Sequence, residues 1–234
     1  MKSNQITNSG IYRLGGIAGI CAGLFILTFA IISESKGILF APGALADGAI
    51  DNWLQNVRSH ADASRFLLIL PIMGFFAMLI VGMVMYQIIA ENFWQKNLSL
   101  VGYVIGVPVV VGAFVAHLSL VNQLVLPLTQ SVELDTQVRF FTTVSIHRWE
   151  IVNSFIGPSF VIILGHTLMA WAAHKANMFP KWLTYWALFN GSLLLISFLY
   201  FVSPVLKIAS IGAPLSMLWL ITLGVTLLKM SRAA

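Results

Sequence analysis

The fold is decided first by the stretch Phe66–Ala90, which reads FLLILPIMGFFAMLIVGMVMYQIIA and contains no charged residue. An apolar run of this length is long enough for an α-helix to cross the hydrocarbon core of a bilayer. The whole chain has the same character, since 59% of its 234 residues are hydrophobic and only 9% are charged. A soluble domain has roughly 25% charged residues. The sequence therefore predicts an integral membrane protein, because apolar side chains can face outward into lipid.

Further apolar runs lie on both sides of this stretch. The six predicted spans are 11–32, 66–90, 99–127, 150–174, 182–202 and 205–228. They predict an all-α polytopic membrane protein in which residues 1–234 form a single bundle of six transmembrane helices. Only Ser203 and Pro204 separate the last two spans.

Two longer connections, 33–65 and 128–149, join spans on one side of the membrane. In each connection apolar residues recur at helical spacing, which predicts short amphipathic helices in these outer loops. The residues concerned are Ile50, Trp53, Leu54 and Val57 in the first loop, and Val138, Phe141 and Val144 in the second. Such helices either cap the bundle or act as a lid over an outward pocket.

An even number of spans places both termini on the same side of the membrane. The short connections on that side, 91–98 and 175–181, are basic, and short basic loops face the cytoplasm. We therefore expect a multi-pass protein of the bacterial inner membrane with both termini in the cytoplasm. The surrounding partner is the lipid bilayer.

Several classes of function are disfavoured by composition. The net charge is +5, but no basic face with interleaved aromatic residues is present, so we expect no nucleic-acid partner. Cys21 is the only cysteine, which excludes an intrachain disulfide and a cysteine-based metal site. Metalloprotease, nucleophile-elbow, phosphate-loop and dinucleotide motifs are absent from the sequence. The sequence predicts no catalytic residues, no metal and no cofactor.

Small residues recur at every fourth position in two spans. Gly15, Gly19 and Gly23 form such a ridge in the first span, and Gly102 and Gly106 form one in the third. Small residues allow two helix backbones to approach closely. The ridges predict helix packing inside the bundle, with a seam to another membrane protein subunit or a second copy as the alternative.

Prolines lie inside four spans, at Pro71, Pro108, Pro158 and Pro214. Each removes one backbone hydrogen bond and bends its helix. Broken helices build solute sites in transporters, and bent helices also occur in bundles that carry no site.

One candidate site is an outward-facing polar pocket formed by His117, His147, Arg148, Glu150 and Asn153. Ionisable groups at membrane depth are costly and mark functional sites. Glu150 and Asn153 share a helix face at i,i+3, and His117 lies in the outer half of the third span. The alternative is that Arg148 and Glu150 are solvated by lipid headgroups.

A second candidate is the intramembrane pair His166 and Asn190, which lie at similar depth in the fourth and fifth spans. We expect an interhelical hydrogen bond between them. The depths of His117 and His166 differ by ~12–15 Å at 1.5 Å per residue. This difference disfavours haem or another tetrapyrrole held between the two histidines, although that group stays an alternative.

Three stretches carry a resemblance to a known family. They are Arg13–Gly19 (RLGGIAG), Phe179–Leu183 (FPKWL) and Leu218–Leu220 (LWL). They resemble the start of helix one, the entry to helix five and an element of helix six in a family of bacterial six-helix membrane proteins described as a domain of unknown function. The resemblance implies an inner-membrane location and no known catalytic residues.

These observations favour a non-catalytic membrane protein that acts through helix packing, as a structural or accessory subunit of a larger complex. The first alternative is a small transporter or sensor that uses the outward polar pocket. The second is a cofactor-binding redox protein that uses His117 or His166.

Overall fold

The protein is all-helical over residues 2–38, 49–125, 142–145, 151–152, 156–201 and 204–233, which the computed structural model describes. The α-helices are α1 (Lys2–Ser35), α2 (Ala49–Ser59), α3 (Ala61–Ile88), α4 (Trp94–Val125), α6 (Leu168–Lys175), α7 (Lys181–Ser197) and α8 (Gly212–Ala233). The π-helix η2 (Ser159–Thr167) leads directly into α6, and the 3-10 helices η3 (Phe198–Phe201) and η4 (Pro204–Ile211) lie between α7 and α8.

Among the described residues, four helices are long and apolar enough to cross a membrane. They are Ser9–Ser35, Ala61–Ile88, Trp94–Gln123 and Gly212–Ala233. These helices correspond to four of the predicted spans. The two other predicted spans differ in form. α7 has only 17 residues before the chain turns into η3, and the described part of span 150–174 contains the π-helix η2 followed by α6.

Changes of helix type occur next to proline and glycine. Gly157 and Pro158 come directly before η2, and Pro158 has no N–H to donate. Within η2 the Thr167 hydroxyl also donates to a backbone carbonyl, that of Ile162, at 3.1 Å. Bends were expected at the prolines, and at Gly157–Pro158 π-helical residues lie on both sides, at 156 and at 159–167.

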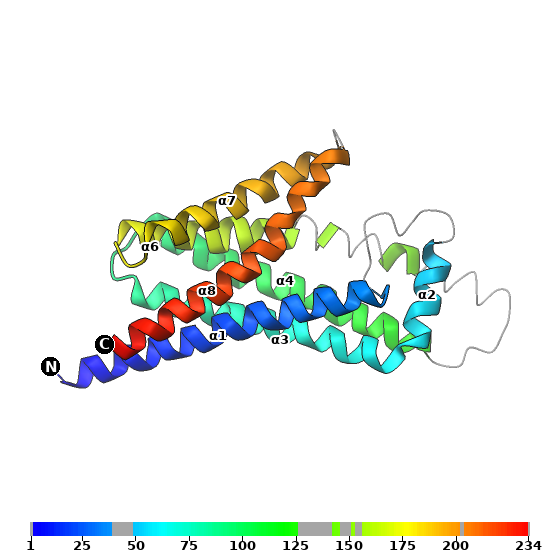
Figure 1. Cartoon of the computed structure of the whole chain (residues 1–234), viewed down its shortest axis with the longest axis horizontal. Coiled ribbons are helices and arrows are strands. Elements are labelled where there is room, and N and C mark those ends of the chain that lie inside the picture. Colours follow the sequence, from blue (N-terminus) through cyan, green and yellow to red (C-terminus); the bar gives the residue numbers. More distant parts are fainter. Residues whose placement is uncertain are drawn as a thin grey trace.

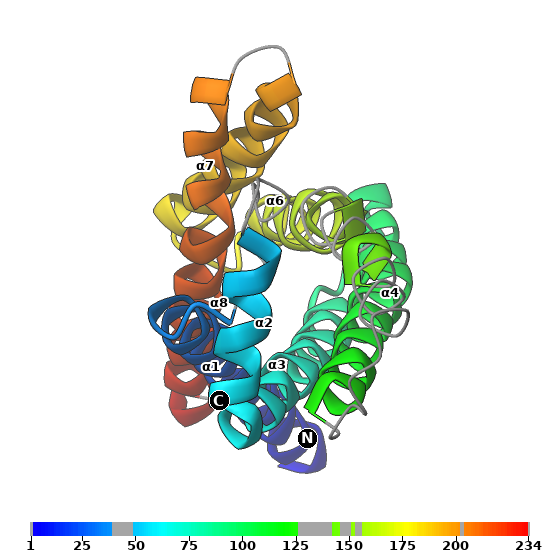
Figure 2. The ribbon, with the colours of Figure 1, turned by 90° about the vertical axis from the view of Figure 1, so that its right-hand side faces the viewer.

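Neighbouring helices form a closed ring. Contacts run from α1 to α3, from α3 to α4, from α4 to η2 and α6, from there to α7, then to α8 and back to α1 (Figure 1). Figure 2 shows the same order in a view along the bundle. Side chains from every member of this ring therefore meet in its interior.

The two ends of the bundle differ. The Ser9 hydroxyl of α1 donates to the Ser231 carbonyl of α8 at 2.7 Å, and both chain ends lie at this terminal end (Figure 1). The short helix α2 lies across the opposite end, which we call the α2 end (Figures 1 and 2).

The amphipathic helix predicted in the first long connection is α2, and its apolar face packs on protein. Trp53, Leu54 and Val57 are all buried. The indole N–H of Trp53 donates to the Ile38 carbonyl at 3.0 Å. The Asn56 amide donates to the Gly37 carbonyl at 3.2 Å. Two hydrogen bonds therefore attach α2 to the end of α1.

Gly37 is suited to this attachment because its φ is +62°, a conformation that favours glycine. A Cβ at this position would lie 2.5 Å from the Asn56 amide nitrogen. In the second connection, Val144 belongs to a described helical segment at 142–145, whereas Val138 and Phe141 lie outside the described residues.

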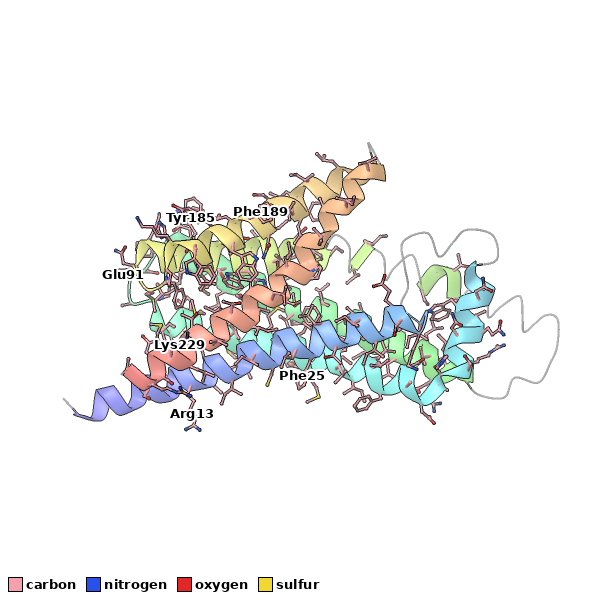
Figure 3. All side chains as sticks on the ribbon, in the orientation of Figure 1. Arg13, Phe25, Glu91, Tyr185, Phe189 and Lys229 are labelled. Atoms are coloured by element: carbon pink, nitrogen blue, oxygen red, sulfur yellow. The ribbon has the colours of Figure 1, made fainter. Side chains whose placement is uncertain are left out.

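The outer surface of the bundle carries exposed apolar residues along its length, and charged residues lie toward both of its ends. Tyr185 and Phe189 point outward from α7 and are more than half exposed. Arg13, Glu91 and Lys229 lie toward the terminal end (Figure 3). An apolar belt with charged residues toward both ends is the surface expected of a protein that lies in a bilayer.

Candidate functional site

The first glycine ridge packs against the chain's own helices. A Cβ at Gly19 would lie 3.0 Å from the Leu220 carbonyl oxygen and 3.1 Å from the Cα of Gly224, both in α8. A Cβ at Gly23 would lie 2.6 Å from the Met217 carbonyl oxygen. Gly15 faces α3 as well, because its Cβ would lie 2.5 Å from the side chain of Val84.

The second ridge brings α4 onto the π-helix. A Cβ at Gly102 would lie 2.6 Å from the Phe160 carbonyl oxygen and 2.9 Å from the Gly165 nitrogen. A Cβ at Gly106 would lie 2.7 Å from the Cβ of Phe160. The Ser99 hydroxyl of α4 donates to the Gly165 carbonyl at 2.6 Å. The backbone of η2 is therefore held against α4.

A small pocket lies at the α2 end, and we call it the α2 pocket. Three polar residues line it: Ser33 of α1, Ser64 of α3 and His117 of α4. The apolar lining consists of Phe29, Ile38, Val57, Leu68 and Val121. Its cavity volume of about 10 Å³ is about what one water molecule needs.

The two serine hydroxyls of the α2 pocket differ in whether they have a hydrogen-bond partner. The Ser64 hydroxyl donates to the His60 carbonyl at 2.9 Å. The Ser33 hydroxyl is buried, and within the described part of the chain it has no hydrogen-bond partner. His117 is buried beside Trp53, with ring centroids 6.0 Å apart. A buried hydroxyl without a partner costs about 1–3 kcal/mol, and a polar guest in the pocket would remove that cost.

The predicted outward pocket overlaps this cavity at one residue. His117 lines the α2 pocket, whereas His147, Arg148, Glu150 and Asn153 lie outside the described residues. Sequence reasoning missed Ser33 and Ser64. Serine hydroxyls inside apolar helices bond their own helix carbonyls so often that their presence alone does not indicate a pocket.

The predicted pair His166 and Asn190 lies in the bundle interior, where both residues are 1% exposed. Neither imidazole nitrogen of His166 and neither amide atom of Asn190 has a hydrogen-bond partner among the described residues. The expected hydrogen bond between the two side chains is therefore absent. The helices that carry them are in contact, since the Thr167 hydroxyl lies 3.3 Å from the Ala187 carbonyl.

Two aromatic residues complete this region. The Tyr103 ring of α4 lies 5.6 Å from the His166 ring and packs on Gly165, and its buried hydroxyl also lacks a partner in the described part of the chain. Trp219 of α8 lies on the other side, 5.2 Å from the His166 ring. Asn190 is linked to this region through its neighbour Gly191, where a Cβ would lie 2.5 Å from the hydroxyl oxygen of Thr167, the residue after His166. We call Tyr103, His166 and Asn190 the polar cluster. Sequence reasoning missed Tyr103, although a tyrosine deep in an apolar span was a signal.

Neither region gathers metal ligands in the described residues. No group of three or more His, Cys, Asp or Glu side chains there lies close enough to hold a metal ion. The polar cluster contributes one imidazole, one phenol and one amide, which together are suited to hydrogen bonding with an uncharged molecule.

A family model described as a domain of unknown function, DUF4386, matches residues 18–229. The chain belongs to this family. The DUF4386 match confirms the expectation of an uncharacterised family. It also spans the lining of the α2 pocket and the whole polar cluster. No curated protein and no solved structure matches the chain.

Proposed function

We propose that this DUF4386 protein binds a small uncharged polar solute in the α2 pocket, as a transporter or sensor of the bacterial inner membrane. The observation that supports this proposal is the Ser33 hydroxyl. It is 1% exposed, lines the same cavity as His117, and has no hydrogen-bond partner in the described residues. A solute that donates or accepts a hydrogen bond there would satisfy it.

The chemistry of the lining selects the class of solute. Among the described residues, those that line the α2 pocket include no Asp, Glu, Lys or Arg. A charged guest would lose its hydration without gaining an opposite charge, which is expensive in a low-dielectric interior. Two hydroxyls and an imidazole among apolar side chains favour a small molecule such as urea, acetamide or glycerol.

The helix α2 would act as the lid. Val57 of α2 forms part of the lining, and the cavity is too small for anything much larger than water while α2 is in place. Two hydrogen bonds, from Trp53 and Asn56, join α2 to the end of α1. With 11 residues, α2 is much shorter than the long helices of the ring, and lids are drawn from the low-stability parts of a fold.

The proposal includes a topology. In it, η2 with α6 and α7 with η3 cross the membrane beside the four long helices, which gives six crossings. The terminal end then faces the cytoplasm and the α2 pocket faces outward. The short basic connections near Lys96 and Lys175 support this orientation.

Ligand-induced stabilisation tests the proposal. The protein is reconstituted in nanodiscs, and its thermal unfolding is followed with urea below denaturing concentration, acetamide or glycerol. A solute that binds only the folded state raises the midpoint in a concentration-dependent way. Ser33→Ala should weaken binding about 3- to 10-fold, the factor for one neutral hydrogen bond.

Ser35→Ala is the matched control, because Ser35 is exposed on the same helix and its hydroxyl bonds only the Ile32 carbonyl in the described structure. This control should bind as the unmodified protein does. If none of the three solutes shifts the midpoint, or if both alanine variants behave alike, the proposed pocket is wrong.

The accessory-subunit role stays an alternative proposal. Its sequence support came from the glycine ridges, and those glycines pack against the chain's own helices α8, α3 and η2. Co-purification of a stoichiometric membrane partner would favour it. The haem alternative predicts an absorbing protein, so a visible spectrum of the purified protein tests it.

A further inference from the structure

One buried face of α4 connects the α2 pocket with the polar cluster. His117 and Tyr103 lie 14 residues apart on this helix, which is about 21 Å along its axis. Between them Val107, Val110 and Phe114 are buried at alternating spacings of three and four residues. Residues at this spacing share one side of an α-helix. The same side of α4 therefore carries a polar residue at each end and apolar residues between.

The apolar middle of this face is closed by three phenylalanines. The ring of Phe114 lies 5.3 Å from the ring of Phe29 in α1 and 5.9 Å from the ring of Phe75 in α3. Toward the polar cluster, Val110 packs on Gly157, where an added Cβ would lie 2.5 Å from the valine side chain. Helices from both sides of the ring thus meet at this level through apolar side chains.

The far end of the face is polar and unsatisfied. Tyr103, His166 and Asn190 come from three different elements of the ring, and each is at most 1% exposed. Their phenol, imidazole and amide groups all lack hydrogen-bond partners among the described residues. Polar groups buried in a bundle are normally paired, so unpaired groups from three helices call for a molecule that pairs with them.

We propose that the polar cluster is a second binding site for the same class of small uncharged solute, reached from the α2 pocket along the buried face of α4. Phe114, between Phe29 and Phe75, closes the path in this structure. The inference rests on the proposed function and makes the protein a transporter rather than a sensor.

The chemistry of the cluster matches that class of solute. Tyrosine, neutral histidine and asparagine each offer both a donor and an acceptor. The three residues of the cluster carry no formal charge, so an ion would meet no compensating group among them. The π-helix η2 carries His166 into the bundle, and π-helical segments recur at functional sites because their irregular hydrogen bonding re-aims side chains.

The experiment measures uptake of urea and glycerol into proteoliposomes by stopped-flow light scattering. Vesicles with protein should take up at least one of these probes faster than protein-free vesicles. Asn190→Leu should abolish the protein-dependent part of uptake, because leucine has a similar size and no polar atoms. In nanodiscs the same variant should keep the thermal shift that reports binding at the α2 pocket.

Asn97→Leu is the matched control, since Asn97 is exposed in the first turns of α4 and bonds the side chain of Asn92. It should leave uptake unchanged. Phe114→Ala should raise uptake by removing the ring that closes the path. If Asn190→Leu fails to fold, Tyr103→Phe replaces it, because this change removes only the unpaired hydroxyl. We expect Tyr103→Phe to slow uptake about 3- to 10-fold.

Two results would overturn the inference: no protein-dependent uptake of either probe, or uptake that Asn190→Leu and Tyr103→Phe leave unaltered. In both cases a thermal shift that Ser33→Ala weakens and Ser35→Ala leaves unaltered would still support the α2 pocket. Conversely, uptake lost in Asn190→Leu, together with a thermal shift that Ser33→Ala leaves unaltered, would retain the polar cluster and remove the proposed pocket. The two failures are therefore distinguishable.

Discussion

The indole ring of Trp219 lies 5.2 Å from the imidazole ring of His166, with the two ring planes inclined at 33°. The indole N–H donates to the Leu183 carbonyl of α7 at 2.8 Å, so Trp219 links α8 to α7 while its face lies against η2. The tryptophan is almost completely buried. Three segments that are far apart in sequence are thus joined through one side chain, at the level of the polar cluster.

We expect Trp219→Phe to destabilise the protein. The change removes the hydrogen bond to Leu183 and part of the ring that packs on His166. The hydrogen bond alone contributes about 0.5–1.5 kcal/mol, and the cavity left by the smaller ring adds to the loss. Chemical unfolding in detergent micelles gives the free energy. Trp182→Phe is the control, because Trp182 is 52% exposed, and equal losses for the two variants would contradict the assigned role of Trp219.

Asn190→Leu should have the opposite effect on stability. The Asn190 amide is buried and has no hydrogen-bond partner in the described residues. Replacing such a group with an apolar one of similar size recovers its desolvation cost, about 1–3 kcal/mol. A variant that unfolds at a higher temperature while losing uptake would show that the amide is kept for function. A large loss of stability would instead mean that Asn190 is hydrogen-bonded in the membrane-embedded protein.

Local patterns made the long helices predictable. The apolar runs at 11–32, 66–90 and 99–127 fall inside α1, α3 and α4 apart from residues 89–90 and 126–127, because hydropathy and length alone determine whether a helix suits a bilayer. The positions of His117, His166 and Asn190 inside apolar runs also placed them correctly within helical segments, in α4, η2 and α7. Such properties depend on neighbours in the sequence.

Tertiary relationships were less predictable. The glycine ridge at Gly19 and Gly23 indicates that another helix packs closely there. It does not identify that helix as α8, which is distant in sequence. The amphipathic pattern of α2 fits a lipid surface as well as a protein surface, and only the fold places Trp53 against α1 and α4. Likewise the gathering of Tyr103 with His166 depends on how α4 meets η2.

The contact between α1 and α8 provides a stability prediction. A Cβ at Gly224 would lie 2.6 Å from the Gly16 carbonyl oxygen and 2.8 Å from the Ile20 nitrogen, and backbone atoms cannot move aside easily. Gly224→Val should therefore cost about 1–3 kcal/mol or more, since overpacking forces the two helices apart. Gly112→Val should be tolerated, because nothing lies within 4 Å of a Cβ there. Chemical unfolding of both variants in detergent measures the difference, and an unaffected Gly224→Val would contradict this packing.

The side of the membrane on which the turn between α6 and α7 lies distinguishes six membrane crossings from four. The Lys175 ammonium lies 5.6 Å from the ring centre of Phe93, so this turn is at the same end of the bundle as the connection between α3 and α4. If η2 with α6 and α7 with η3 both cross the bilayer, Asn177 and Glu91 face the cytoplasm together. If only the four long helices cross, the segment between α4 and α8 stays on the outer side, and Asn177 is accessible from outside.

Single cysteines in a Cys21→Ala background separate these outcomes. In intact cells a membrane-impermeant maleimide should label Asn52→Cys, which is on the exposed side of α2, and should label Glu91→Cys and Asn177→Cys only after permeabilisation. All three positions are exposed, so a lack of reaction reports the membrane and not burial. Labelling of Asn177→Cys from outside, with Glu91→Cys protected, would leave four crossings and move the polar cluster out of the membrane-spanning core. If Glu91→Cys and Asn177→Cys were both labelled in intact cells while Asn52→Cys was protected, the orientation would be reversed. The α2 pocket would then face the cytoplasm.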